Sequence, residues 1–550
     1  MSALIFYSGI TAITLFEGLG IANGQQMAYY LILLLPGALF VTEYFKNGNK
    51  QQTLPFGFIK LYSLFLGTAL IGIFFGVDWQ RSFASWWVLL AIGLIFIFVY
   101  QNQVLLRNYF VLWCSSLSVF FLLWSFGLNI IPLKVITFLI PSSGNNWVWA
   151  SYGRHNHLGD WLLLVTIICL YQLYKQKHLK ICLIGLGIFI PALIWAGSRA
   201  AIVSLFIIMV VFLLIRIRAY RLSRILIVSS SIILMVLTIG LIQITLLSHT
   251  SRPLFSPRDQ YYSHALWATK TRPVTGLGLG NYIYASVKNS INNPDNWTDT
   301  AHNFLADYFA EGGLILGTLM IILVIYLMRR QDKRRIFFWL FLIMLINFLF
   351  DYIYRFNAIW VIFFVIAALG YQEKKFIITS NWLGIIGGLL LLIMVQLQIF
   401  SQLALKQQQY DRALFFYPFN KEAWIGSIKA NQNTFQPPVL LTWGKIMFSG
   451  DTSVLEKVGD ISLEFDKKQA LKNYEQAYYW DVYSGKTLFK KIYLLKKELK
   501  GQRIAFQFIK MHFTQLEKIN HTKTSISFAV TEAQQFCQQI YNYQCPYQLD

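Results

Sequence analysis

Thirteen apolar runs of membrane-spanning length are the feature that most constrains what this chain can fold into. A helix needs about 20 apolar residues to cross the hydrocarbon core of a bilayer. The chain has 550 residues, of which 56% are hydrophobic and only 13% are charged, and these values exclude an ordinary soluble domain. We therefore predict an all-α polytopic membrane protein with about 13 transmembrane helices. The runs lie at about 4–23, 27–45, 57–76, 84–101, 108–128, 157–174, 180–196, 199–216, 225–247, 303–328, 336–351, 357–371 and 381–401.

The basic residues between these runs alternate from one turn to the next. Every second turn is rich in Lys and Arg, whereas the turns between carry single exceptions at Arg81, Arg199 and Arg355. This pattern is typical of the positive-inside rule, and it explains a net charge of +22 without nucleic acid as a partner. It predicts a cytoplasmic N-terminus, with the first run retained as an anchor rather than cleaved, and it places the 129–156 loop, the 248–302 loop and everything after residue 401 outside the cytoplasm. The basic turns contain Lys46/Lys50, Arg107, Lys175/Lys177/Lys180, Arg216/Arg218/Arg221/Arg224, Arg329/Arg330/Lys333/Arg334/Arg335 and Lys374/Lys375.

The composition changes after residue 401 to a polar segment rich in Lys, Glu and Gln, with helical periodicity. We predict that residues 402–550 form a separate extracytoplasmic helical domain. The stretches beginning at Leu403 and Lys467 share an Ala and aromatic pattern that resembles degenerate tetratricopeptide-type helix pairs. Such repeats would make the domain an interaction or positioning module, and a passive solvated cap is the alternative. Cys537 and Cys545 would lie on the oxidising side, where they could form a disulfide or remain two thiols.

A long polar stretch from Ser248 to His302 interrupts the apolar pattern between the ninth and tenth runs. Loops of this length inside compact architecture are usually functional or disordered, and the aromatic residues and Pro–Gly punctuation of this one argue against disorder. We therefore place the active site of the protein in this loop. Its side chains include Arg252, Arg258, His264, Lys270, Arg272 and Lys288.

The sequence GSRAA, which contains Ser198 and Arg199, opens the eighth run. Ser198 is suited to cap the helix, and an arginine beside the free N–H groups of a helix start can bind an anion such as phosphate. The alternative is that Arg199 only extends its side chain to the lipid head groups. Farther along, Arg258 is followed by a GLGLG segment, whose Gly276, Gly278 and Gly280 permit tight turns. This segment is not a nucleotide loop, because no strand–helix unit surrounds it; by position alone, Arg258 is equally well explained as a solvated charge.

The sequence TAHNFLADYFAEGG leads into the tenth run. A cap at Thr300 or Asp299 would put His302 in the first turn of the helix, where the dipole lowers an imidazole pKa. We therefore expect His302 to be neutral and able to accept a proton, with a purely structural histidine as the alternative. Asp307 and Glu311 lie four residues apart on one helix face, where carboxylates within a span mark either a functional site or a buried ion pair.

A polar group also opens the sixth run, with the sequence SYGRHNHLGD. It gathers Arg154, His155, Asn156, His157 and Asp160 on the same predicted side of the membrane. Two histidines do not complete a zinc site without a third ligand at compatible spacing. We therefore predict no metal site in this segment.

Four of these pieces, in this order, resemble the O-antigen ligase/polymerase superfamily of membrane glycosyltransferases, which includes protein O-oligosaccharyltransferases. They are G-R-H-N-H-L-G opening one run, G-S-R-A opening a later one, a long loop of the form R…ALW…RP..G.GLGN, and A-H-N-F-L…E-G-G-L-I-L-G. The resemblance covers roughly residues 150–320, and the piece that begins with His302 is its most specific part. The first 130 residues match only as generic spans, and the polar tail does not match.

The resemblance implies a GT-C-type architecture and a bacterial plasma membrane protein whose donor is a glycan on a polyprenyl diphosphate, with no metal or other cofactor. It implies that Arg199 and Arg258 bind the diphosphate and that His302 is the catalytic histidine of the loop. Arg258 is the least secure of these assignments, because Arg252 and Arg272 lie close by. Secondary candidates for the site are Arg154, His155, Asn156, Arg272, Asn303, Asp307 and Glu311.

The chemistry of such a transfer suits these residue types. The leaving diphosphate is anionic and needs fixed cations, and an acceptor hydroxyl benefits from a general base. The acceptor itself, whether a glycolipid such as lipid A-core, a growing glycan or a protein hydroxyl, is left open. A lipid-linked oligosaccharide flippase or another transporter is the competing class, but it should show internal repeats, and none is evident in this sequence.

Overall fold

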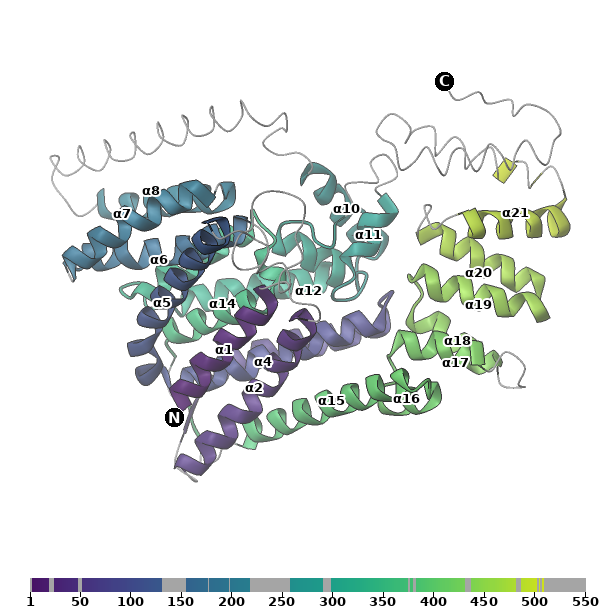
Figure 1. The fold of residues 1–550 in the computed structure, drawn as a ribbon, viewed down its shortest axis with the longest axis horizontal. Coiled ribbons are helices and arrows are strands. Elements are labelled where there is room, and N and C mark those ends of the chain that lie inside the picture. The colour runs from purple at the N-terminus through teal and green to yellow at the C-terminus, as the bar shows by residue number, and fades with distance from the viewer. Residues whose placement is uncertain are drawn as a thin grey trace, which may run out of the picture.

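The computed structural model describes residues 2–18, 24–47, 52–130, 155–176, 178–196, 198–217, 258–289, 298–373, 376–378, 382–430, 437–480, 486–501, 504 and 507–508. Two parts are visible in Figure 1: a bundle of apolar helices, and a smaller set of helices formed by the C-terminal residues. Helices α10 and α11 and the loop between them lie where the two parts meet.

The apolar bundle is built from the runs that the sequence predicts, which confirms an all-α polytopic membrane protein. Twelve of the thirteen runs coincide with a helix, and the run at 225–247 lies outside the described residues. Six of the helices are long and apolar enough to cross a membrane, and the other six are apolar but shorter. The helices are α1 (Ser2–Gly18), α2 (Gly24–Asn47), α3 (Phe56–Phe74), α4 (Trp79–Gln101), α5 (Gln103–Ile130), α6 (His155–Tyr174), α7 (Leu179–Ala196), α8 (Arg199–Ile217), α12 (Phe304–Arg329), α13 (Ile336–Phe348), α14 (Asn357–Gly370) and α15 (Trp382–Lys406).

Helix α14 lies at the centre of the bundle. Of its fourteen residues, only Asn357 is not buried. Its Trp360 stacks on Phe363 at 5.3 Å between ring centroids, and its start is capped from α1 by Glu17, whose carboxylate accepts from the backbone N–H groups of Asn357 and Ala358. Because Phe356 at the N-cap provides no side-chain cap, Glu17 supplies the acceptor that this helix start needs.

Several basic turns gather at one end of the bundle. There β1 (Gln52–Leu54) pairs antiparallel with β2 (Phe376–Ile378), and the Arg107 Nε donates to the Leu369 carbonyl at 2.6 Å. The turn after α12 closes on the turn after α14 through a bridge between Gln331 and Tyr371. The spatial grouping of these turns agrees with the alternation of basic residues in the sequence.

The opposite end of the bundle carries the polar elements. They are the turn from Phe75 to Asp78, α10 (Arg258–Thr271), α11 (Tyr282–Asn289) and the short 3-10 helix η4 (Ile353–Arg355), which joins α13 to α14. The first turn of α12 also lies there. The stretch that the sequence predicts as a single loop therefore contains two helices.

The C-terminal part consists of helices packed on their neighbours in sequence, as the helical periodicity predicts. Asp451 caps α19 by accepting from the Val454 N–H, and α20 follows after the single residue Asp466. Whether these helices are tetratricopeptide repeats stays a prediction, and Cys537 and Cys545 lie outside the described residues. The helices are α16 (Tyr410–Phe416), α17 (Lys421–Ala430), α18 (Pro437–Met447), α19 (Thr452–Phe465), α20 (Lys467–Trp480) and α21 (Lys486–Lys500).

Candidate functional site

Two glycine-containing motifs of the sequence pack against each other beside the start of α12. The helix is broken at Gly313, whose φ of 65° is left-handed, so the carbonyls of Ala310 and Glu311 are free to accept other donors. They accept from the N–H groups of Leu277 and Gly278 at 3.0 and 2.7 Å. The GLGLG segment is thus a loop whose backbone bonds to α12 at the break in this helix. This contact explains why both motifs are present in the same sequence.

Gly276 shows why this contact requires glycine. Its φ is 63°, a conformation that side chains other than glycine rarely adopt. A Cβ atom at this position would lie 2.4 Å from the carbonyl carbon and oxygen of Glu311. The tight turns predicted for the GLGLG segment are therefore present, and they bring the loop directly onto the α12 backbone.

His302 lies just before α12 and not within it. The N-cap is Asn303, whose Oδ1 accepts from the N–H groups of Leu305 and Ala306 at 3.0 and 3.2 Å. The prediction of a cap at Thr300 or Asp299, with His302 in the first helical turn, is therefore wrong. The physical reason is that the Thr300 hydroxyl bonds to Asp307 instead. The dipole argument for a neutral His302, which assumed a position in the first turn, falls with it.

The backbone of His302 adopts a left-handed conformation, with φ of 56°. Such a conformation costs a residue other than glycine on the order of 1 kcal/mol or more, and it persists only where the surroundings enforce it. The N–H of His302 donates to the Thr300 Oγ1 at 3.1 Å. The imidazole is half-buried between two aromatic rings, stacked on Tyr261 of α10 at 5.1 Å and edge-on to Tyr352 at 4.6 Å between ring centroids.

Asp307 is the group that holds the His302 segment in place. Its Oδ1 accepts from the backbone N–H of Ala301 at 2.7 Å, and its Oδ2 accepts from the Thr300 and Tyr354 hydroxyls at 2.8 and 2.5 Å. Thr300 and Ala301 directly precede His302, and Tyr354 lies two residues after Tyr352. One carboxylate therefore joins the segment that carries His302 to the segment that carries Tyr352, whose ring contacts the imidazole.

Arg355 joins Asp307 to Glu311. Its guanidinium lies 3.1 Å from Asp307 Oδ2 and 2.5 Å from Glu311 Oε1. The carboxylate side chains are 3% and 5% exposed, whereas the arginine side chain is 25% exposed. Burial lowers the pKa of Arg355 and the two carboxylates raise it by more, so its pKa lies well above the ordinary value. Of the two interpretations open for the pair on α12, the buried ion pair is the one that the structure shows.

Helix α10 separates Arg258 from Arg272, and the sequence alone could not decide which of the two lies closer to His302. Arg258 is its first residue, one turn before Tyr261, which stacks on His302. Arg272 follows its last residue, and its Nη1 donates to the Phe75 carbonyl at 2.5 Å. A helix of fourteen residues is about 20 Å long, so the two arginines lie at opposite ends, and Arg258 is at the end near His302.

The motifs that open α6 and α8 are in contact. A Cβ atom on Gly159 would lie 2.4 Å from the Cβ of Ser198, so only a glycine allows α6 and α8 to approach this closely. Ser198 accepts from the Ala201 N–H at 3.3 Å, which confirms it as the cap of α8. Arg199 is the first residue of α8, but its side chain lies outside the described residues, as do Arg154 and the side chains of His155 and Asn156.

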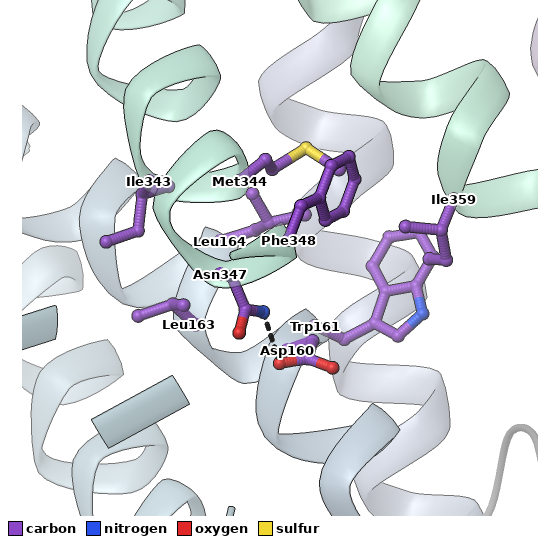
Figure 2. A pocket seen from close by; sticks show the side chains of 9 residues that line it. All are labelled: Asp160, Trp161, Leu163, Leu164, Ile343, Met344, Asn347, Phe348 and Ile359. Carbon is purple, nitrogen blue, oxygen red and sulfur yellow. Dashed lines mark hydrogen bonds between the residues drawn. The ribbon is translucent and has the colours of Figure 1, made fainter. Parts of the chain in front are cut away.

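Asp160 of the same motif borders a separate cavity inside the bundle. Its Oδ1 accepts from the Nδ2 of Asn347 on α13 at 2.6 Å, and the rest of the lining is apolar (Figure 2). The cavity volume is about 10 Å³, close to the smallest space that holds one water molecule. This cavity is too small for a sugar and does not enlarge the site at His302.

Several residues of the site escaped the sequence analysis. Tyr261, Tyr352 and Tyr354 are ordinary in type and spacing, and no local pattern marks them. Arg355 carried a signal, because it is an isolated cation in a turn otherwise poor in Lys and Arg, while two carboxylates in a neighbouring predicted span lacked a counter-charge. Pairing this isolated cation with the two carboxylates would have predicted the ion pair.

The end of the bundle that holds α10, η4 and the start of α12 contains a packed imidazole and two arginines, Arg258 and Arg355. The imidazole of His302 is packed against Tyr261 and Tyr352, and Arg258 begins the helix that carries Tyr261. Arg355 is held by carboxylates and serves first to fix the backbone. Such an arrangement suits removal of a proton from a hydroxyl beside an anionic leaving group.

Comparison with known proteins agrees with this description. Residues 184–322 match the protein family described as O-antigen ligase, and this segment contains α8, α10, α11, His302 and the first part of α12. The resemblance predicted from the four sequence motifs is thereby confirmed. No curated protein matches the chain.

Proposed function

We propose that this chain is a membrane glycosyltransferase that transfers a glycan from a polyprenyl diphosphate to an acceptor hydroxyl. The match of residues 184–322 to the O-antigen ligase family supports this proposal. The observation that carries the proposal is the fixation of His302 within this domain. Its backbone is held in the left-handed region, its ring is packed between Tyr261 and Tyr352, and Arg258 lies one turn from Tyr261.

The proposed reaction is a single displacement at the anomeric carbon of the donor. The acceptor oxygen forms a bond to this carbon while the bond from the carbon to the diphosphate oxygen breaks, so the configuration is inverted. His302 accepts the proton of the acceptor hydroxyl as the new bond forms. The polyprenyl diphosphate leaves with the electron pair of the broken bond, and its increasing negative charge requires cations nearby.

Arg258 and Arg199 are the proposed partners of the diphosphate. Arginine suits this role because its planar guanidinium donates two parallel hydrogen bonds to phosphate oxygens. Each arginine begins a helix, α10 and α8 respectively, and the free N–H groups of a helix start favour the same anion. The isoprenoid chain of the donor would then extend along the lipid-facing side of the bundle.

The side of the membrane and the acceptor are also part of the proposal. The resemblance to O-antigen ligases supports a bacterial plasma membrane protein. The alternation of basic turns supports a cytoplasmic N-terminus, with His302 and the C-terminal helices on the outer side. Lipid A-core, a growing polysaccharide and a protein side chain all provide a hydroxyl to the same base. The acceptor is to be identified by supplying each to the purified protein.

Substitutions of His302 test the proposal in the purified protein reconstituted with a polyprenyl-diphosphate-linked glycan and these acceptors. His302→Ala should lower the transfer rate by roughly 10²–10⁴-fold, the contribution typical of a general base. His302→Gln should be nearly as impaired, because glutamine can orient a hydroxyl but cannot remove its proton. Donor binding should persist in both variants, because Arg258 and Arg199 remain.

His178 provides the matched control. It also has a left-handed backbone, with φ of 52°, but it is exposed in the turn between α6 and α7. His178→Ala should transfer glycan at the wild-type rate. Near-normal transfer by His302→Gln would exclude proton removal by His302, and normal transfer by His302→Ala would reject the assignment of the site.

A further inference from the structure

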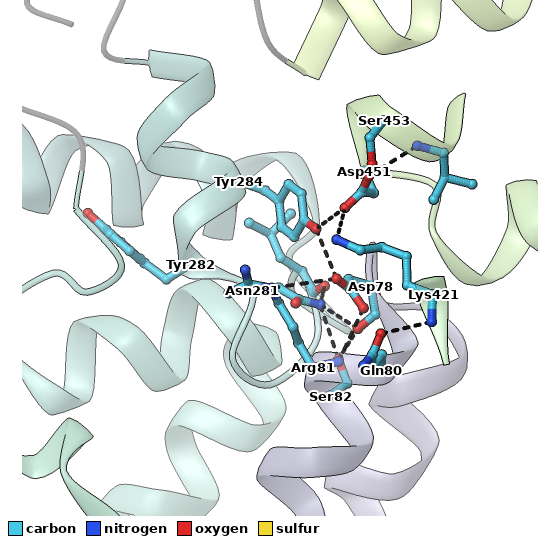
Figure 3. Close-up of polar contacts among 12 residues, drawn as sticks. Asp78, Gln80, Arg81, Ser82, Asn281, Tyr282, Tyr284, Lys421, Asp451 and Ser453 are labelled. Atoms are coloured by element: carbon cyan, nitrogen blue, oxygen red, sulfur yellow. Dashed lines mark hydrogen bonds and ion pairs between the residues drawn. The ribbon is translucent and has the colours of Figure 1, made fainter. Parts of the chain in front are cut away.

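Helix α11 has two tyrosines that point in opposite directions (Figure 3). Tyr284 points toward the C-terminal helices, and Tyr282 points away from them. Because the helix is only eight residues long, a displacement of one ring moves the backbone that carries the other. The contacts of the two tyrosines therefore show which parts of the molecule α11 connects.

The Tyr284 hydroxyl lies between carboxylates from the two parts of the molecule. It donates to Asp78 Oδ2 at 3.0 Å and lies 3.5 Å from Asp451 Oδ2. Both carboxylates cap helices: Asp78 accepts from the Arg81 N–H at the start of α4, and Asp451 accepts from the Val454 N–H at the start of α19. A capping carboxylate is fixed by its own helix, so Tyr284 is held between two rigid points.

Two cations balance this cluster. The Lys421 Nζ lies 2.8 Å from Asp451 Oδ2, and the Arg81 Nε lies 3.5 Å from Asp78 Oδ2. The backbone N–H of Lys421 also donates to Gln80 Oε1 at 3.0 Å. The first residue of α17 is thus attached both to the start of α19 and to the start of α4, as Figure 3 shows.

The backbones at this junction are bonded as well. The N–H of Gly450 donates to the Val77 carbonyl, and the N–H of Val77 donates to the Leu277 carbonyl, both at 2.9 Å. A Cβ atom on Gly450 would lie 2.8 Å from the Val77 Cβ and 3.3 Å from a ring carbon of Tyr284. The C-terminal helices therefore lie directly against the GLGLG loop and α11, with no space for a larger residue at Gly450.

On the other side of α11, Tyr282 is bonded to both supports of His302. Its hydroxyl donates to the backbone carbonyl of Tyr261 at 2.7 Å, and its N–H donates to Glu311 Oε1 at 3.2 Å. Tyr261 stacks on His302, and Glu311 is the carboxylate that Arg355 joins to Asp307. Tyr282 is fully buried, so these bonds hold α11 in one position relative to the imidazole.

We propose that the C-terminal helical domain is a positioning element of the transfer site, and that Tyr284 is the positioning residue through which it acts. Docking at Gly450, Asp451 and Lys421 holds Tyr284 and hence α11, and α11 holds Tyr261 and Glu311 beside His302. The effect on the reaction rests on the proposed function of His302, whereas the mechanical connection does not. The inference favours a positioning module over a passive solvated cap for residues 402–508.

A steric wedge at Gly450 tests this connection without altering a charged group. Gly450→Ala should separate the C-terminal helices from Val77 and Tyr284. We expect amide hydrogen exchange to become at least several-fold faster in residues 276–289 and 298–312 of the purified full-length protein. The kcat of glycan transfer should fall about tenfold, because small displacements of a catalytic group lower rates strongly, while the KM for the donor should change by less than about twofold.

Gly444→Ala is the matched control for the wedge. Gly444 lies on α18, where the nearest atoms to an added Cβ are side-chain carbons of Trp424 and Ile428 at 3.7 and 3.8 Å. This is ordinary van der Waals contact, so exchange and kcat should stay at the wild-type level. A thermal unfolding measurement on both variants identifies any loss caused by general destabilisation.

Tyr284→Phe provides a second variant that removes only the hydroxyl. One hydrogen bond contributes about 1 kcal/mol, so we expect kcat to fall about fivefold, with faster exchange in residues 276–289. Tyr474→Phe is its control, because the Tyr474 hydroxyl donates to Asp460 Oδ1 at 2.8 Å entirely within the C-terminal helices. It should leave kcat and these exchange rates unchanged.

The two readouts separate the inference from the proposed function. Wild-type exchange in residues 276–289 and 298–312 of the Gly450→Ala and Tyr284→Phe variants would overturn the connection, whatever their activity. Equal loss of kcat in the Tyr284→Phe and Tyr474→Phe variants would likewise overturn it. Faster exchange with unchanged transfer would support the connection between the domains and would count against His302 as the proposed base.

Discussion

Two networks of buried carboxylates lie at the same end of the bundle. One joins groups within the bundle, and the other joins the bundle to the C-terminal helices. In the first, Asp307 and Glu311 belong to one helix and share Arg355. In the second, Asp78 belongs to the bundle and Asp451 to the C-terminal helices, and each carboxylate has its own cation. The first network therefore fixes a local backbone, whereas the second determines how two parts of the molecule sit against each other.

The two networks also differ in how strongly the loss of one side chain should affect them. Removing one partner from a buried ion pair leaves an uncompensated charge and costs about 3–5 kcal/mol. Arg355 serves two carboxylates at once, so the first network has no substitute for any member. In the second network the backbone bond from Gly450 to Val77 remains if one side chain is lost. We therefore expect changes in the first network to affect transfer more strongly.

The largest effect should come from Asp307→Asn, with Asp451→Asn as the matched change in the second network. An amide at position 307 keeps one acceptor oxygen but cannot accept from the Thr300 hydroxyl, the Tyr354 hydroxyl and Arg355 on its nitrogen side. We expect kcat to fall about 100-fold for Asp307→Asn, because the His302 segment loses its geometry, and less than about tenfold for Asp451→Asn. Steady-state transfer kinetics measure both, and equal losses would contradict the distinction between the networks.

The two arginines at the ends of α10, Arg258 and Arg272, allow a further comparison. Arg258 lies at the end of the helix near His302, and Arg272 lies at the end near the junction, bonded to the Phe75 carbonyl. Arg258→Ala should weaken donor binding about tenfold or more, as expected for loss of a charge-assisted hydrogen bond. Arg272→Ala should affect donor binding by less than about threefold. Titration with a polyprenyl diphosphate lacking the glycan measures this directly, and the reverse ranking would transfer the diphosphate role to Arg272.

The smallest expected effect concerns His264, which lies on α10 between these two ends. Burial lowers the pKa of His264, although a backbone hydrogen bond to Asn289 opposes this. The unfolded chain therefore binds a proton at His264 more readily than the folded chain, and the stability from its neutral form is complete above the ordinary pKa near 6.5. It is lost as the pH falls from there through the lower pKa of the folded state.

His264→Phe should remove this part of the acid sensitivity. Between pH 7 and pH 5 the unfolding temperature of the wild type should fall more than that of the variant. The difference in free energy of unfolding amounts to about 1.4 kcal/mol for each unit by which the two pKa values differ. His178→Phe, at an exposed position, should show the wild-type acid sensitivity, and parallel curves for the wild type and His264→Phe would contradict the prediction.

The bundle was predictable from the sequence because the cause of each span is local. A run of apolar residues is sufficient to specify a membrane helix, and twelve runs coincide with helices. The cap of α12 was not predictable, because T-A-H-N offers several capping side chains within four residues. The choice of Asn303 depends on Asp307 and Tyr354 engaging the Thr300 hydroxyl, and Tyr354 lies 54 residues farther along the chain.

In the candidate site, too, some residues were predictable from the sequence and their contacts were not. His302 and Arg258 could be proposed from motif order, and Asp307 and Glu311 from the presence of charge inside a span. Their arrangement depends on Arg355, 44 residues after Glu311, and on packing of aromatic rings, neither of which leaves a periodic pattern. Long-range partners of this kind become visible only when the helices have been placed in space.

The junction at Tyr284 also has a consequence for how the protein is made. Its hydroxyl bonds to Asp78, 206 residues earlier in the chain, and faces Asp451, 167 residues later. A ribosome synthesises these three residues in order, so the bundle and α11 exist before their last contact does. A nascent or truncated chain that ends before Asp451 has the motif histidine and arginines but lacks the clamp on α11. If Tyr284 positions the site as proposed, the last domain to be synthesised is also the part that completes it, and a chain that ends before Asp451 should be slower than the finished protein.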